Sequence, residues 1–152
     1  MALLAATPQR LAATCAGVPG ERLRERPAPD EWSANEVLAH LRACADARGG
    51  VIPLILAEHH PTLRAVNPLT WIKKTDYLDL EFEPSLRAFS NQRAELLTLL
   101  EPLPTEAWSR SATFTGAGRP LERTVLFYGQ WLARHERPHV KQVERIVGAL
   151  KR

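Results

Sequence analysis

Cysteine is scarce in this chain, and its scarcity excludes the disulfide-rich class of small secreted proteins. Only two cysteines occur among 152 residues, Cys15 and Cys44, and both stand in apolar segments with helical periodicity. Domains that depend on disulfides carry more cysteines, often in a regular framework. We therefore interpret both residues as reduced side chains of the core and expect a cytoplasmic protein.

Long apolar runs and charge of one sign are also missing. No stretch approaches the roughly 18 apolar residues that a membrane-spanning helix needs. The N-terminal apolar run has no basic residues before it and is interrupted at Pro8-Gln9-Arg10, so we expect no signal peptide and no membrane association. The 20 basic and 17 acidic residues are scattered and give a net charge of +3, which is too weak a bias to predict nucleic-acid binding.

Proline, in contrast, is plentiful, and most of the 12 prolines separate segments with helical periodicity. These segments predict helices over residues 7–17, 33–58, 82–101 and 120–150. The clearest start is the capping box Ser33-x-x-Glu36, and Thr7-Pro8 resembles an N-cap followed by proline at the first helical position. Gly49 and the glycine after it predict a bend within the second helix.

The connections are polar and contain no convincing strand pattern, apart from SATFTGAGR within 102–119, which could form a small hairpin. Four helices without a sheet to cover are typical of an all-α four-helix bundle. We therefore predict that residues 1–152 form one such domain. Bundles of this kind build their metal sites from side chains on facing helices.

The last predicted helix carries two histidines on its apolar face. Its inward positions, spaced three or four apart, are Leu121, Val125, Tyr128, Leu132, His135, His139, Val143, Ile146 and Leu150. Residues four apart share one face of a helix, so the two imidazoles can bind one metal ion. A single histidine at such a position would more often be a hydrogen-bonded core residue, but two in register favour a metal.

The segment HERPH also has the H-E-x-x-H spacing of zinc proteases, in which the glutamate, here Glu136, is the general base. A protease would need a third ligand beyond His139, and position 145 is Arg. We therefore interpret Glu136 as a solvated helix residue. His40 is the only other histidine in a buried helical register, so we predict that it is the third ligand. His59 and His60 stand where a helix should end and are expected to face water.

The order of these motifs resembles the DinB-like (damage-inducible, YfiT-like) superfamily of metal-dependent enzymes. The resemblance rests on W-S-x-x-E-V-L-x-H-L at Trp32–Leu41, R-x-x-L-L at Arg93–Leu97, and the terminal H-x-x-x-H followed by Q-V. It implies an up-down-down-up bundle, often a homodimer, with a divalent metal on His40, His135 and His139. Pro138 departs from the family pattern, because relatives commonly have another histidine there.

The resemblance also implies a small-molecule substrate, and some relatives are transferases or isomerases that use a low-molecular-weight thiol. The resemblance thus implies a divalent-metal-dependent S-transferase or hydrolase, and zinc and nickel are metals that suit three imidazoles. Arg93 and Tyr128 are candidate catalytic residues, as a carboxylate clamp and a hydrogen-bond donor, although a structural ion pair and core packing are the simpler roles. The alternatives are a non-catalytic ligand-binding bundle with a structural or vestigial metal, and a metal-free interaction protein.

Overall fold

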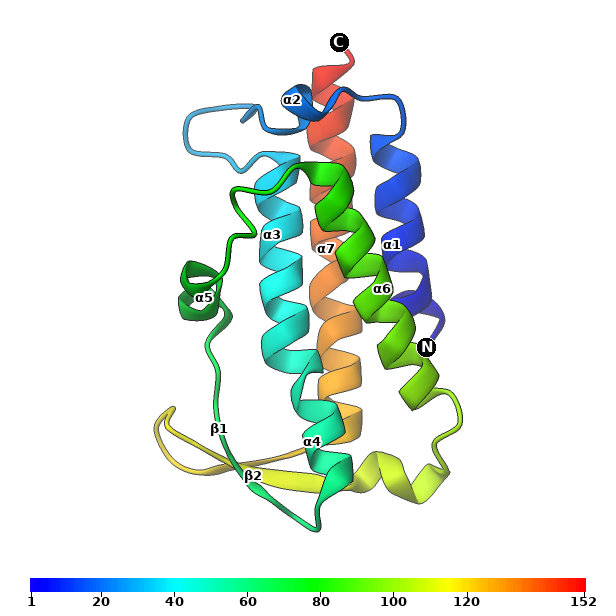
Figure 1. The fold of residues 1–152 in the computed structure, drawn as a ribbon, viewed down its shortest axis with the longest axis vertical. Helices are drawn as coiled ribbons and strands as arrows, with labels where there is room; N and C mark the ends of the chain where they lie inside the picture. Colours follow the sequence, from blue (N-terminus) through cyan, green and yellow to red (C-terminus); the bar gives the residue numbers. More distant parts are fainter.

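Four long helical segments form the body of the molecule, which the computed structural model describes over residues 1–152 (Figure 1). They are α1 (Ala2–Cys15), α3 continued by η1 and α4 (Ala34–Cys44, Ala45–Gly49 and Val51–Ala57), α6 (Phe82–Leu100) and α7 (Val125–Leu150). In Figure 1, α1 and α7 rise while α3–α4 and α6 descend. The predicted all-α bundle and its up-down-down-up topology are confirmed. No helix combines the length and apolar composition needed to cross a bilayer.

Short elements lie at the two ends of the bundle and, for α5 (Pro68–Trp71) and η2 (Ile72–Lys74), beside α3 (Figure 1). The others are α2 (Gly20–Leu23), η3 (Thr105–Ser109), β1 (Thr62–Arg64), β2 (Ser111–Thr115) and β3 (Leu121–Thr124). The predicted hairpin is present, since β2 and β3 pair antiparallel. The parallel strand β1 beside it was not predicted, because three residues show no periodicity. Leu121 lies in β3 and is exposed, so the prediction that it belongs to the last helix was wrong.

The start of the first helix differs from the prediction. The helix begins at Ala2, and Pro8 lies inside it. Thr7 does not cap the helix; its hydroxyl donates to the carbonyl of Leu3 at 3.1 Å. Because proline has no N–H, Pro8 leaves the carbonyl of Leu4 without its usual helical donor. Arg93 Nη1 of α6 donates to that carbonyl at 2.9 Å instead, so the proline creates an acceptor for a neighbouring helix.

The second helix starts and bends as its sequence predicts. Ser33 and Glu36 form the capping box, with each side chain bonded to the backbone N–H of the other. Near Gly49 the helix widens into the π-helical segment η1, whose last amide, Gly50 N, contacts the carbonyls of both Ala45 and Asp46 at 3.1 Å. A Cβ atom on Gly50 would stand 2.4 Å from the Asp46 carbonyl oxygen, so this turn requires glycine.

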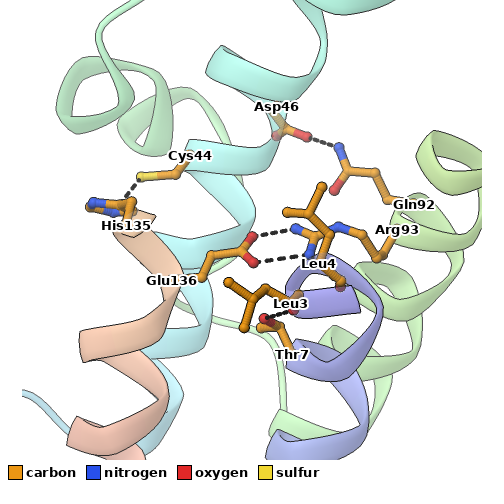
Figure 2. A network of polar contacts seen from close by, with 9 residues as sticks. All are labelled: Leu3, Leu4, Thr7, Cys44, Asp46, Gln92, Arg93, His135 and Glu136. Atoms are coloured by element: carbon orange, nitrogen blue, oxygen red, sulfur yellow. Dashed lines mark hydrogen bonds and ion pairs between the residues drawn. The ribbon is translucent and has the colours of Figure 1, made fainter. Parts of the chain in front are cut away.

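A layer of polar side chains divides the core into two apolar clusters. One cluster contains Leu11, Leu38, Phe89 and Val143, and the other contains Leu4, Ile52, Leu100 and Leu132. Between them lie four buried residues that belong to neither cluster, one from each long helix: Thr7, Cys44, Arg93 and Glu136 (Figure 2). This polar layer, midway along the bundle, is where the predicted site residues gather.

Candidate metal centre

Two rows of side chains face each other where α3 packs against α7. The α3 row is His40, Cys44 and Arg48, and the α7 row is Trp131, His135 and His139. Within each row the residues are four apart, so they share one face of their helix. The two rows bring together side chains that are about ninety residues apart in the sequence.

Three ligand atoms converge at the middle of these rows. His40 Nε2 lies 3.1 Å from His135 Nε2, and Cys44 Sγ lies 3.5 Å and 3.4 Å from these two nitrogens. Figure 2 shows the contact between Cys44 and His135. All three ligand atoms lie within 4.8 Å of one another. Cys44 was predicted only as a reduced core residue; it is free and buried, and it also belongs to this cluster.

The spacing of this cluster fits a tetrahedral metal ion. Metal–nitrogen bonds of ~2.0–2.1 Å and a metal–sulfur bond of ~2.3 Å place the nitrogens about 3.3 Å apart and the sulfur about 3.6 Å from each. The observed separations of 3.1, 3.4 and 3.5 Å are within a few tenths of an ångström of these values. Imidazole nitrogen and sulfur are also the donors that zinc and similar ions prefer.

His139 stands beside this cluster. Its ring centroid is 4.9 Å from that of His40 and 4.7 Å from that of His135, so the three predicted rings lie together. Its Nδ1 is 2.9 Å from Gln142 Oε1. Because an amide oxygen only accepts, Nδ1 is the donor in this contact, and in the neutral ring the lone pair is then on Nε2. A hydrogen bond of this kind commonly orients a metal-ligating histidine.

Two tryptophans frame the three imidazoles. The Trp131 ring stacks on His135 at 4.5 Å, and the Trp32 ring lies 5.1 Å from His40 and 6.4 Å from His139. Burial, followed by the charge of His139, lowers the pKa of His40. The same two influences, together with His40 and Arg48, lower the pKa of His135 to about 4. Both rings are therefore neutral near pH 7, which is the form that binds metal.

Cys44 is the least acidic group of the cluster. Burial raises the pKa of its thiol to about 12, against an opposing effect of the Arg48 charge. Without a cation nearby the sulfur therefore keeps its proton. A bound divalent cation inverts this preference, because a coordinating thiol is deprotonated.

Glu136 is not solvated, so that prediction was wrong. Its side chain is 1% exposed, and both carboxylate oxygens accept from Arg93, which is 3% exposed; Nη1 donates to Oε2 at 2.9 Å and Nη2 to Oε1 (Figure 2). Glu136 follows His135 directly, so it points about 100° around α7, toward α6 and α1. A carboxylate held in this way is not available as the general base of a protease.

The same pair defines the role of Arg93. Its Nη atoms donate to Glu136 and to the carbonyl of Leu4, so it forms the structural ion pair that the sequence favoured. Tyr128 lies two turns before His135 in the apolar cluster, where its ring packs on Phe114 at 5.3 Å. His59 and His60 are exposed, as expected.

Two members of the rows, Cys44 and Arg48, were missed as site residues. Their signal was present, because they continue the four-residue spacing of His40 along the same helix face. A cysteine in an apolar segment and a single arginine do not by themselves indicate a site. They do so only once the facing row on α7 is known.

Comparisons with known proteins agree with the fold. A model described as the DinB superfamily matches residues 3–143. Among solved structures, YfiT from Bacillus subtilis matches with a TM-score of 0.73 and 18% sequence identity, over 97% of this chain and 85% of that one. It is described as a probable metal-dependent hydrolase with an unusual four-helix bundle topology. No curated protein matches the sequence. At 18% identity the structural match shows a shared fold.

Proposed function

This chain belongs to the DinB superfamily, and from that premise we propose that it is a divalent-metal-dependent enzyme acting on a small molecule. In this proposal His40, His135 and His139 hold the ion. The chemistry is hydrolysis or the transfer of a group to or from a low-molecular-weight thiol. The hydrolase description of the structurally similar YfiT supports the first form, and the family resemblance supports the second.

The observation that carries the proposal is the 3.1 Å separation of His40 Nε2 and His135 Nε2. A hydrogen bond between two neutral imidazoles would by itself explain this distance. A third imidazole and a thiol, however, also lie against this pair, as expected of a metal site. The carboxylate of Glu136 is committed to Arg93, so it cannot neutralise a protonated imidazole here. A divalent cation would use the lone pairs of these two Nε2 atoms, and His139, whose ring lies beside both, would supply the third.

Three histidine ligands would leave coordination positions open, as catalytic sites require. The bound ion, zinc or nickel, would supply a Lewis acid that activates a water molecule or a thiol as nucleophile. The chain's own residues have supporting roles. Gln142 orients His139 through Nδ1, and Trp32 and Trp131 cover the rings and limit the access of water.

Cys44 supports a second candidate function. Its sulfur is as close to the two histidine nitrogens as a metal ligand needs to be. If Cys44 joins all three histidines, the ion has four protein ligands and the site is closed, as in structural metal sites. The protein would then be a non-catalytic ligand-binding bundle stabilised by its metal.

Metal analysis of single variants separates these possibilities. Protein purified without chelator is examined by elemental analysis, and its cobalt-substituted form by absorption spectroscopy. For the enzyme, His40→Ala, His135→Ala and His139→Ala should lose the ion, whereas Cys44→Ser should retain it. Wild type should then show no thiolate-to-cobalt charge-transfer band. The exposed His59→Ala is the matched control and should bind as wild type does.

The other outcomes are equally informative. A charge-transfer band that disappears in Cys44→Ser would support the closed site. Wild-type protein without metal, even after incubation with zinc or nickel, would refute both candidates.

Three further properties stay predictions: a homodimer, a cytoplasmic location and the absence of nucleic-acid binding. The homodimer is the easiest to test. Light scattering should give twice the 17.0 kDa chain mass, and the mass of a single chain at micromolar concentration would contradict it.

A further inference from the structure

Arg48 ends the α3 row beside the candidate metal centre. It lies on η1, four residues after Cys44. Its guanidinium carbon is 5.2 Å from the centroid of the Trp131 ring, the same ring that stacks on His135. Burial raises the pKa of the Cys44 thiol, and the charge of Arg48 is the largest influence opposing it. The guanidinium therefore lies close enough to act on the site.

Apart from the Trp131 ring, this arginine has no partner in the protein. It forms no ion pair and no hydrogen bond, and its Nε is buried without an acceptor. Buried donors are almost always satisfied in folded proteins, so an orphaned one calls for an explanation. Arg93, the fully buried arginine of the polar layer, shows the contrast, since both of its Nη atoms have acceptors.

The acid on the same segment, Asp46, and the buried acid of the polar layer, Glu136, are both engaged elsewhere. Asp46, two positions before Arg48 on η1, accepts hydrogen bonds from Trp71 Nε1 at 2.9 Å, Tyr77 Oη at 2.6 Å and Gln92 Nε2 at 2.7 Å. Glu136 is bonded through both oxygens to Arg93. Neither carboxylate forms an ion pair or a hydrogen bond with Arg48, so no acid of the protein occupies the guanidinium.

We infer that Arg48 binds an oxyanion, a carboxylate or phosphate group, of the substrate. The two Nη atoms of Arg48 have no acceptor and, unlike Nε, are not buried, and they form the planar end of the guanidinium that matches two oxygens of such a group. The Trp131 ring supports the guanidinium from one side. The remainder of an anionic small molecule bound there would extend along the rows toward His135 and His40. The inference rests on the proposed function for the identity of that molecule as a substrate.

Wide helical turns such as η1 are frequent at functional sites. Here the turn, made possible by Gly50, separates two charged side chains of opposite sign. Asp46 lies within hydrogen-bond reach of α5 and α6 side chains, while Arg48 lies beside α7. Asp46 and Arg48 therefore contact different helices and do not pair with each other, so the Arg48 guanidinium stays available to a ligand.

The test is a titration of the full chain with three small probes: acetate, inorganic phosphate and uncharged acetamide. The decisive form uses metal-free protein, because an anion can also bind a metal directly. The nitrogen-15 resonance of Arg48 Nε reports binding to this guanidinium. Acetate or phosphate should shift it saturably, and acetamide should not. Arg48→Gln should weaken anion binding about tenfold or more, since it removes a charge-assisted pair, and Arg48→Lys should weaken it less.

The matched control is Arg87→Gln, which removes the same charge from an exposed position on α6 and should leave anion binding unchanged. Thermal denaturation of each variant verifies that it is folded. The inference is overturned if the Arg48 Nε resonance does not respond to either anion, or if Arg48→Gln and Arg48→Lys bind both as wild type does. Metal content is measured separately, so its loss in wild type would refute the proposed function and leave the anion titration valid.

Discussion

The buried pair of Arg93 and Glu136 makes the sharpest prediction about stability. Glu136→Met leaves a guanidinium, only 3% exposed, without its carboxylate. Removing one partner of a buried ion pair destabilises a protein by about 3–5 kcal/mol, because the remaining charge stays out of water without compensation. For a chain of this length each kcal/mol lowers Tm by about 2–4 °C, so the expected loss is roughly 6–20 °C.

Glu136→Gln should fall near the lower end of that range. Glutamine has the same shape and keeps one oxygen that can accept from Arg93. The double variant Arg93→Met/Glu136→Met should recover most of the loss, since two apolar side chains of similar size remove both charges. It should remain slightly less stable than wild type, because the carbonyl of Leu4 loses its donor, an effect of about 1 kcal/mol.

Urea denaturation followed by circular dichroism measures these differences, with the exposed pair Arg87→Met/Glu83→Met as control. That pair is separated by 4.0 Å on the surface of α6 and should contribute no more than about 0.5 kcal/mol. A Glu136→Gln protein within about 1 kcal/mol of wild type, together with no recovery in the double variant, would refute the reasoning. Metal content should be retained in Glu136→Gln, whereas a general base of a protease would show its effect in hydrolysis.

Three further predictions concern the helices that hold the site. Pro138 is exposed inside α7 and has no N–H to donate to the carbonyl of Arg134, so Pro138→Ala should raise the unfolding free energy by roughly 1–3 kcal/mol in urea titrations; an unchanged midpoint would contradict this cost of the missing bond. Gly50→Ala should destabilise η1, visible as loss of Arg48 Nε protection in hydrogen exchange, and a fully stable Gly50→Ala protein would show that the turn tolerates Cβ. Burial alone raises the pKa of Glu36, but bonds from Arg26 and from the Ser33 N–H lower it overall. Since a lowered carboxyl pKa stabilises the fold only while the group is ionised, wild type should exceed Glu36→Gln in stability above about pH 4.5, and this advantage should shrink as pH falls further; a pH-independent difference would be inconsistent.

The bundle was predictable because its helices carry long periodic patterns. The stripe through Phe89 and Arg93 predicted α6 almost to the residue, and the Ser33–Glu36 box located the start of α3. The gathering of His40 with the last helix was predictable for the same reason, as buried stripes must face one another.

What could not be predicted depended on single contacts between distant segments. Glu136 looks solvated in the sequence because nothing near it on α7 reveals that Arg93 approaches from α6. Pro8 looks like a helix start because its local pattern matches one, and only the packing of α6 shows that its missing N–H is used. Cys44 becomes a candidate ligand only when α7 supplies His135.

The bond from Arg93 to the carbonyl of Leu4 has a consequence for how the molecule opens. N-terminal helices commonly fray and exchange their amide hydrogens early. Here the first turns of α1 close over an ion pair that also joins α6 and α7. Lifting α1 away would admit water to that pair and break a contact between three helices at once. The beginning of this chain should therefore open together with its end, as part of one cooperative unit rather than as a loose terminus.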